Sequence, residues 1–104
     1  EEYSIVKQGV LLKCPLAVSV PPQVTWEDLI HNEGIEPKRI YSSNQNPNFE
    51  IDSDNQNRDN YQVESDYSLR IKSVQFDDAG LYICTSHFNS SLELKEQIYL
   101  NVFG

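Results

Sequence analysis

Hydrophobic residues alternate with polar residues in several short segments of this chain. The alternation has a period of two, which is the period at which side chains reach the same face of a β-strand. It predicts strands within the segments 10–16, 24–26, 67–71, 81–86 and 98–102. The longer period that an amphipathic helix requires is almost absent. The pattern therefore predicts an all-β protein.

Residues that favour turns separate these segments. Proline, glycine, asparagine and aspartate gather at 21–22, 32–34, 46–48 and 77–80, and each of these residue types favours a tight turn. The segment 42–60 is nearly all polar, and we expect it to form surface loops and short edge strands. Many short strands with regular breaks are typical of a β-sandwich.

Length and charge limit the classes of partner. The 104 residues suffice for one compact domain, which we place at 1–104. Sixteen acidic residues against eight basic ones give a net charge of −8. Such a surface repels nucleic acid and the anionic face of a membrane, so we expect neither nucleic-acid binding nor direct membrane contact. A protein partner fits this charge better. No segment reaches the roughly 18 apolar residues that a membrane-spanning helix requires.

The two cysteines, Cys14 and Cys84, both lie at positions that the alternation places on the inner face of a strand. A zinc site needs more ligands than these two, and His31 and His87 do not form the close pairs of zinc motifs. We therefore expect no metal site. If the cysteines form a disulfide, closing so long a loop stabilises the fold by roughly 4 kcal/mol. Two buried, reduced thiols of a cytosolic protein are the alternative that the residues alone leave open.

The sequence contains no pattern typical of a catalytic site or a calcium site. A nucleophilic hydroxyl needs a base within hydrogen-bonding distance, and no nucleophile-elbow motif is present. The segment 52–57 begins like a calcium-binding loop, but its sixth position is Asn57 instead of glycine. We expect no enzymatic activity and no cofactor.

A set of residues spread over the whole chain resembles the conserved pattern of the immunoglobulin superfamily. The set comprises Cys14, Trp26, Asp78, Gly80, Tyr82 and Cys84. The resemblance implies a Cys14–Cys84 disulfide between two sheets, with the Trp26 ring packed against it. It also implies a tight corner at Gly80 and a Tyr82 hydroxyl that bonds back to the main chain.

Spacing within this pattern is similar to that of the variable type, or V-set. The stretch between Trp26 and Arg58 is long enough for the two extra strands of a variable-type sheet. The expected fold is an immunoglobulin-like V-type β-sandwich, with two antiparallel sheets and one inter-sheet disulfide. Rearranging antigen receptors carry a Phe-Gly-x-Gly bulge before the last strand, and this chain has none there. The resemblance therefore implies a non-rearranging immune-type receptor or an adhesion protein.

The corner aspartate, Asp78, is a further point of comparison. Members of the family often pair it with an arginine at the start of strand D. Asn60 occupies that position here, and Arg58 lies two residues earlier on the same strand face. We expect Arg58 to donate a hydrogen bond or form an ion pair to Asp78.

In V-set domains the sheet of strands G, F, C and C′ commonly packs on another domain. The alternation predicts which residues point outward from this sheet. They are Glu27, Leu29, Arg39, Tyr41, Ile83, Thr85, Tyr99 and Asn101. The apolar and aromatic members form a stripe suited to a protein partner, and Phe88 at the neighbouring loop is expected at its rim. A shift of the register by one residue would reverse every face.

We expect an extracellular recognition module of a cell-surface immune-type receptor or cell-adhesion protein. Its partner would be a protein ligand, a receptor or a second copy of the domain in a homodimer. Asn89-Ser90-Ser91 is an acceptor triplet for N-glycosylation. The alternative is a secreted or structural spacer domain within a longer chain.

Overall fold

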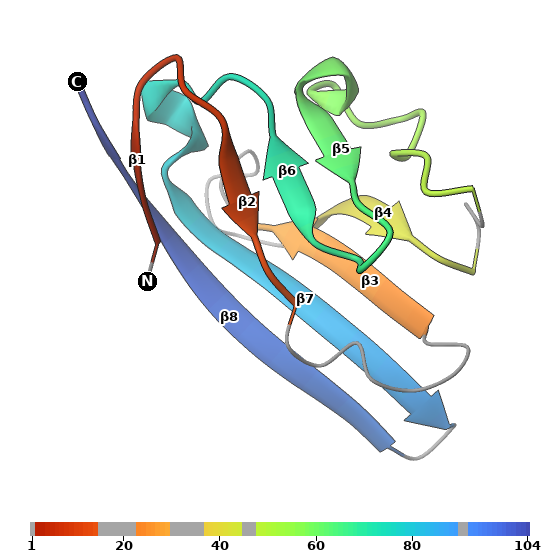
Figure 1. Cartoon of the computed structure of the whole chain (residues 1–104). Coiled ribbons are helices and arrows are strands. Elements are labelled where there is room, and N and C mark those ends of the chain that lie inside the picture. The colour runs from red at the N-terminus through yellow and green to blue at the C-terminus, as the bar shows by residue number, and fades with distance from the viewer. Residues whose placement is uncertain (1, 15–22, 30–36, 45–47, 90–91) are drawn as a thin grey trace.

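The computed structural model describes residues 2–14, 23–29, 37–44, 48–89 and 92–104 (Figure 1). The strands are β1 (Glu2–Ile5), β2 (Val10–Leu12), β3 (Gln23–Asp28), β4 (Lys38–Ser42), β5 (Tyr61–Val63), β6 (Leu69–Ile71), β7 (Gly80–Asn89) and β8 (Leu92–Phe103). Two short 3-10 helices, η1 (Arg58–Asn60) and η2 (Phe76–Asp78), precede β5 and β7. Every segment predicted as a strand overlaps one, whereas β1 was not predicted.

The strands form two sheets that enclose the core (Figure 1). The first sheet has the order β1-β8-β7-β3-β4, and the second has the order β2-β6-β5. β7 and β8 form the longest hairpin of the molecule. β1 pairs with β8 in parallel, whereas the other pairs of described strands are antiparallel. The prediction of two antiparallel sheets is confirmed except at this edge.

The core contains the predicted disulfide. Cys14 and Cys84 are bonded, and their Cα atoms lie 5.9 Å apart. Trp26 belongs to the same buried cluster, and its indole Nε1 donates a hydrogen bond of 2.7 Å to the carbonyl of Tyr67. Because a buried N–H group without a partner destabilises a fold, this bond makes the fully buried indole compatible with the core.

The corner before β7 has the predicted geometry. The Tyr82 hydroxyl donates a buried hydrogen bond of 2.8 Å to the main-chain carbonyl of Asp78. The pKa of Tyr82 is raised well above its ordinary value. Burial is the main cause, and the neighbouring Tyr61 and Asp78 add to it. Gly80 has a φ of 141°, a conformation that side chains rarely adopt, which explains glycine at this corner.

The structure gives Arg58 and Asp78 other partners than the predicted bond between them. The guanidinium of Arg58 donates to the carbonyl of Ser53 at 2.9 Å, and the Asp78 carboxylate accepts the main-chain N–H of Gln75 at 2.8 Å. Asn60 exchanges two hydrogen bonds of 2.9 Å with the main chain of Ser73. These two bonds tie the residue before β5 to the segment after β6.

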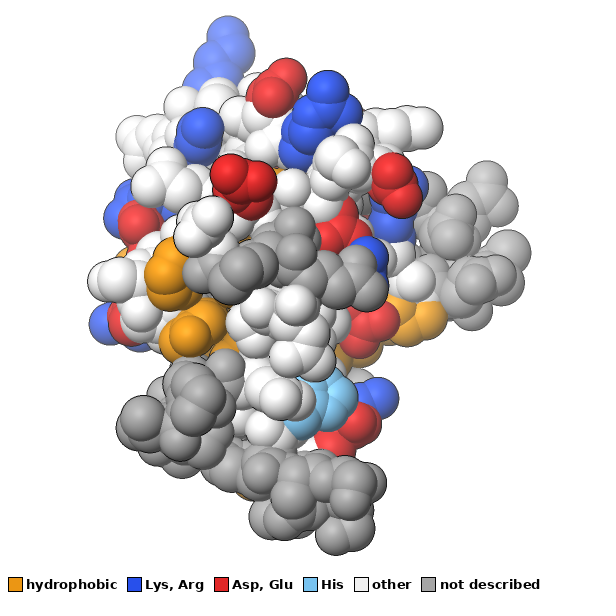
Figure 2. Space-filling view, turned by 90° about the vertical axis from the view of Figure 1, so that its right-hand side faces the viewer, with side chains coloured by type: hydrophobic (Ala, Val, Ile, Leu, Met, Phe, Trp, Pro, Cys, Tyr) orange, Lys and Arg blue, Asp and Glu red, His pale blue; other side chains and the backbone are white. Residues whose placement is uncertain are grey.

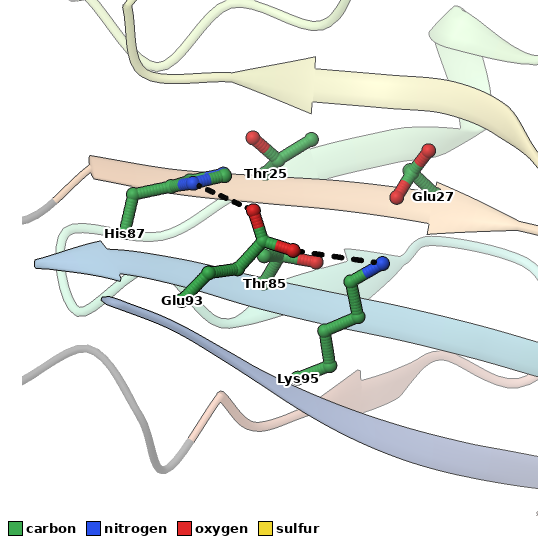
Figure 3. Close-up of a pocket in the computed structure, with 6 residues that line it drawn as sticks. All are labelled: Thr25, Glu27, Thr85, His87, Glu93 and Lys95. Carbon is green, nitrogen blue, oxygen red and sulfur yellow. Dashed lines mark ion pairs between the residues drawn. The ribbon is translucent and has the colours of Figure 1, made fainter. Parts of the chain in front are cut away.

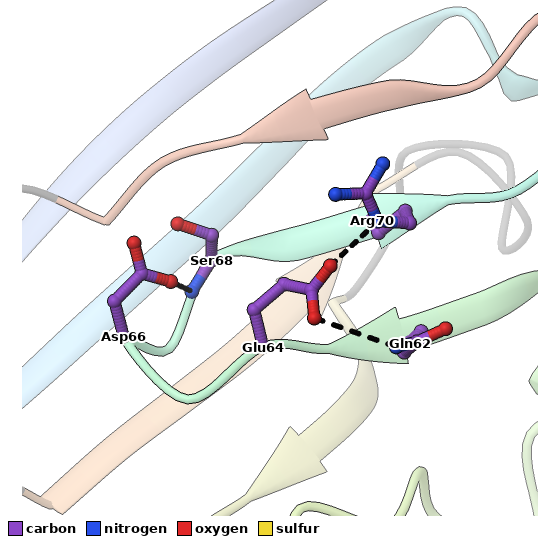
Figure 4. Close-up of polar contacts among 5 residues, drawn as sticks. All are labelled: Gln62, Glu64, Asp66, Ser68 and Arg70. Carbon is purple, nitrogen blue, oxygen red and sulfur yellow. Dashed lines mark hydrogen bonds and ion pairs between the residues drawn. The ribbon is translucent and has the colours of Figure 1, made fainter.

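Polar side chains fix the turn between β5 and β6 (Figure 4). The Asp66 carboxylate accepts the N–H of Ser68 at 3.0 Å, and this bond lowers the pKa of Asp66. Glu64 lies between Gln62, at 3.4 Å, and Arg70, at 2.6 Å. These contacts lie on the surface of the second sheet and stabilise the turn by short-range hydrogen bonds.

One of the two expected extra strands of the V-type sheet is present as β4. Among residues 43, 44 and 48–60, the structure contains turns and η1 but no second extra strand. A single main-chain bond of 2.9 Å, from Asp52 to the carbonyl of Ile40, lies where that strand would pair. The polar composition of this segment explains why it forms surface turns.

Candidate functional site

The outer face of the first sheet is the face turned away from the core. On β3, Val24, Trp26 and Asp28 are buried on the core side, whereas Thr25 and Glu27 point outward and are half-buried. The strand register places outward residues of three strands in rows. The rows are Glu27–Ile83–Gln97, Thr25–Thr85–Lys95 and Gln23–His87–Glu93.

The predicted outward residues on β7 are covered although they face away from the core. Ile83 is 8% exposed and Thr85 is 3% exposed. Ile83 is not part of the buried core cluster. β7 is the central strand of its sheet, so outward side chains of β3 and β8 cover it from both sides. A partner therefore meets the neighbouring side chains before it meets these two.

The prediction that Tyr41 points outward is wrong. Tyr41 is fully buried and belongs to the core cluster. The cause is an irregularity in the pairing of β3 with β4, where Trp26 pairs with Tyr41 but Glu27 pairs with Arg39. Ile40 is the extra residue of this β-bulge, and the bulge breaks the alternation from which the face was predicted.

Buried Tyr41 has a distinct environment. Its ring stacks on Phe49 with centroids 6.5 Å apart, and its hydroxyl has no hydrogen-bond partner in the structure. Burial, and to a lesser extent Tyr67, raises its pKa to about 12. Tyr41 thus belongs to the core and not to the outer face of the sheet.

The most exposed apolar residues of the outer face lie at the β1–β8 edge. We name Tyr3, Ile5, Tyr99 and Phe103 the edge patch, and each is at least 50% exposed. The pairing of β1 with β8 and the alternation along β8 place them on one face. Tyr3 and Phe103 stack with ring centroids 5.9 Å apart. Of this patch, only Tyr99 was predicted. Tyr3 and Ile5 lie on β1, which was missed although both residues alternate with polar ones, and Phe103 lies one residue beyond the predicted strand segment 98–102.

The other predicted surface residues are spread over the first sheet, from β8 to β4. Leu29, Glu27, Arg39 and Asn101 are half-buried. The Arg39 guanidinium forms an ion pair of 2.5 Å with Asp52. The side chains of Phe88 and Asn89 lie outside the described part of the structure, so the rim contact and the glycosylation site stay predictions.

A polar hollow lies beyond the edge patch on the same face (Figure 3). Its volume is about 240 Å³, and it is lined by Thr25, Glu27, Thr85, His87, Glu93 and Lys95. The two carboxylate oxygens of Glu93 are both engaged. One lies 3.2 Å from His87 Nδ1, and the other lies 3.7 Å from Lys95 Nζ. Glu27 and Thr85 were among the predicted outward residues, but the hollow itself was not predicted, because its walls come from three strands whose register only the fold defines.

The described residues offer few groups for metal or nucleophilic chemistry. No group of three or more histidine, cysteine, aspartate or glutamate side chains that could hold a metal ion occurs among them. The Thr85 hydroxyl has no hydrogen-bond partner, so no base activates it as a nucleophile. Charged side chains of both signs are spread over the edge of the molecule near β4, where hydrophobic side chains are few (Figure 2). Among the described helices, none is long and apolar enough to cross a membrane.

Comparison with known proteins agrees with this architecture. No curated protein matches the sequence. The chain is similar to domains 3–5 of Drosophila OTK, with 19% identity, a TM-score of 0.69, and coverage of 100% of this chain but 28% of that one. It is similar to Dpr11 IG1, solved bound to DIP-gamma, with 19% identity, a TM-score of 0.69, and coverage of 97% and 95%. The ZIG-8 IG1 homodimer matches with 13% identity, a TM-score of 0.70, and coverage of 98% and 77%. The family model of the immunoglobulin V-set domain matches residues 5–103, so the chain belongs to the immunoglobulin V-set family.

Proposed function

We propose that this V-set domain is an extracellular recognition module of a cell-surface receptor or adhesion protein. It binds a protein partner through the outer face of the first sheet. The observation that carries this proposal is the edge patch, whose Tyr3, Ile5, Tyr99 and Phe103 side chains are all at least half exposed. Tyrosine and other aromatic residues are enriched at protein interfaces, and a contiguous apolar patch on a soluble domain is typical of one.

Two further observations support the proposal. The Cys14–Cys84 disulfide is of the kind that persists in oxidising compartments, which favours an extracellular location. Among the similar structures, Dpr11 IG1 is bound to DIP-gamma, and ZIG-8 IG1 forms a homodimer. These relatives bind a different protein or themselves, and we propose the same kind of partner here. We also propose Asn89 as a glycosylation site at the rim of the face.

The alternative is a spacer domain in a longer secreted or structural chain. The match to OTK, of which this chain spans 28%, favours a multidomain context but is compatible with either role. The two roles differ at the edge patch, because a spacer needs no partner there beyond its neighbouring domains.

The proposal is tested by substitution of Tyr99, which is 50% exposed on the outer face. The purified domain is assayed for self-association by analytical ultracentrifugation and for pairwise binding to a panel of recombinant ectodomains. In whichever assay detects binding, Tyr99→Asp should weaken it at least about tenfold, as expected for an aromatic contact residue. Tyr99 is a better choice than Ile83, because a charge at the covered Ile83 would also perturb folding.

The matched control is Leu94→Asp. Leu94 is 42% exposed on the same strand, but it pairs with Ser86 and so points to the opposite face of the sheet. Its substitution should leave binding within twofold of the parent domain. Binding that is absent from both assays, or that is equally weakened by the two substitutions, would contradict the proposal.

A further inference from the structure

Glu27 is the one wall residue of the polar hollow whose negative charge is left uncompensated. Among the described residues, no hydrogen bond or ion pair reaches its carboxylate, although the side chain is half-buried. A carboxylate that is partly removed from water gains from a cationic or hydrogen-bonding partner. The structure therefore holds an anionic acceptor that faces the hollow (Figure 3).

The nitrogen-bearing side chains around Glu27 are already engaged elsewhere. Lys95 and His87 both lie against Glu93, each close to a different one of its two carboxylate oxygens. Arg39, which pairs with Glu27 in the strand register, forms its ion pair with Asp52. Since Lys95 and Glu93 balance each other, the net charge that remains among these wall residues is the negative charge of Glu27.

A second unused acceptor lies on the floor of the hollow. Thr85 is 3% exposed, and its Oγ1 atom has no hydrogen-bond partner. Buried hydroxyl groups are nearly always hydrogen-bonded, and each exception calls for an explanation. Thr85 lies diagonally opposite Glu27 across the β3–β7 pair, a placement that separates backbones by about 7–8 Å. Because Thr85 Oγ1 is itself fully buried, a cationic group held by Glu27 reaches this second acceptor when the side chains of β3 and β8 that cover it move aside.

We infer that the hollow receives a basic side chain, arginine or lysine, from the protein partner. This inference rests on the proposed function and specifies the chemistry of the partner. The cationic head donates hydrogen bonds to the Glu27 carboxylate and to Thr85 Oγ1, and the aliphatic stem lies along the wall. The volume of about 240 Å³ accommodates a side chain and not merely one water molecule, whose share of liquid volume is about 30 Å³.

The charge of the whole domain supports a basic partner distinct from a second copy. With a net charge of −8, two copies repel each other at long range, whereas a basic protein is attracted and steered to the surface. An acidic side chain entering the hollow would be repelled by Glu27. It would also find the nearby Lys95 and Arg39 already paired with other carboxylates. Of the charged side chains, only a basic one finds complementary groups there.

The inference is tested with a small probe, so that no partner needs to be known. ¹⁵N-labelled domain is titrated with Nα-acetyl-arginine N-methylamide, and the amide chemical shifts of β3, β7 and β8 are followed by NMR. The neutral norleucine and the acidic glutamate analogues serve as comparison probes. We expect saturable shifts at Thr25, Glu27 and Thr85 with the arginine probe alone, and a lower affinity at higher salt.

Two substitutions should weaken the binding of the arginine probe. Glu27→Gln removes the charge at nearly constant volume, and Thr85→Val removes the hydroxyl at nearly constant shape. Each should raise the dissociation constant at least about fivefold, because hydrogen bonds to charged groups are the stronger ones. Thr85→Val should not lower the melting temperature, since it removes a hydroxyl that has no partner in the folded domain.

The matched control is Glu96→Gln. Glu96 is an exposed glutamate on β8, but its register partner is Cys84, so it points away from the hollow. This substitution should leave the shifts and the dissociation constant unchanged. Shifts that persist undiminished in Glu27→Gln, that appear equally with the glutamate probe, or that are absent altogether would overturn the inference.

The inference and the proposed function fail in different ways. If Tyr99→Asp weakens binding of a protein partner while Glu27→Gln leaves that binding unchanged, the sheet is the binding face but no basic side chain enters the hollow. If Tyr99→Asp has no effect on partner binding, the proposed function itself is wrong, whatever the arginine probe shows.

Discussion

The same substitution at two buried tyrosines should have opposite effects on stability. Tyr82 and Tyr41 both have fully buried side chains, so replacement by phenylalanine removes one hydroxyl from the core in each case. The Tyr82 hydroxyl donates a bond of 2.8 Å to the Asp78 carbonyl, whereas the Tyr41 hydroxyl has no partner. The comparison isolates the hydrogen bond because ring burial is the same at both sites.

The expected magnitudes follow from this difference. Tyr82→Phe loses a hydrogen bond and leaves a buried carbonyl without this donor, which costs about 1–3 kcal/mol of the free energy of unfolding. Tyr41→Phe removes a polar group that is buried without compensation, so stability should stay constant or rise by up to about 1 kcal/mol. For a domain of this size, 1 kcal/mol corresponds to roughly 4–8 °C in melting temperature.

Urea unfolding followed by tryptophan fluorescence measures both variants, since Trp26 is the single tryptophan and lies in the core. The urea concentration at the unfolding midpoint should fall for Tyr82→Phe, and it should stay constant or rise for Tyr41→Phe. The slope of the free energy of unfolding against urea concentration should be unchanged in both variants. A loss of stability of equal size in the two variants would refute the reasoning. It would show that the corner hydrogen bond contributes nothing beyond ring packing.

Two other predictions concern the core. Replacing Cys14 and Cys84 by alanine should lower the free energy of unfolding by roughly 2–5 kcal/mol, measured by urea unfolding of the non-reduced parent against the variant. The free energy of unfolding should also fall as the pH rises from about 10 towards 12. Tyr41 in the unfolded chain loses its proton near its ordinary pKa of 10, whereas burial raises the folded pKa to about 12, so the stability present below pH 10 is lost above it. Urea titrations at stepped pH should show this decline, and Tyr41→Phe should make it shallower; an unchanged slope in that variant would contradict the assignment.

Much of the fold was predictable because its signals are local. Alternation predicted strands at 81–86 and 98–102, which lie within β7 and β8 although both strands extend beyond them, and the spacing of Cys14, Trp26 and Cys84 resembled that of a known domain. The corner at Gly80 and Tyr82 has the predicted geometry, since a glycine and a tyrosine at fixed spacing define it within one segment. β1 was missed because its alternation covers only the four residues of the strand, whereas the alternation that predicted the three-residue strands β2 and β6 extends through 10–16 and 67–71.

The candidate site was less predictable because it depends on relations between strands. The bulge at Ile40 turned Tyr41 from the predicted surface into the core, and no residue near it signals a bulge as glycine often does. Ile83 and Thr85 were correctly placed on the outer face, but their neighbours on β3 and β8 cover them. The hollow became visible only when the register aligned Thr25, Thr85 and Lys95 in one row.

Under the proposed function, the edge patch and the hollow would make two different kinds of contact with a partner. Tyr99 and Lys95 lie four residues apart on β8, about 13 Å along an extended strand, so one partner of ordinary size covers both regions. Burial of the aromatic side chains contributes affinity that depends little on salt, whereas a charge at Glu27 contributes orientation and selectivity that weaken as salt screens it. An apolar patch alone would accept many partners. The uncompensated Glu27 and Thr85 favour those that present a basic side chain at one fixed distance from an apolar surface.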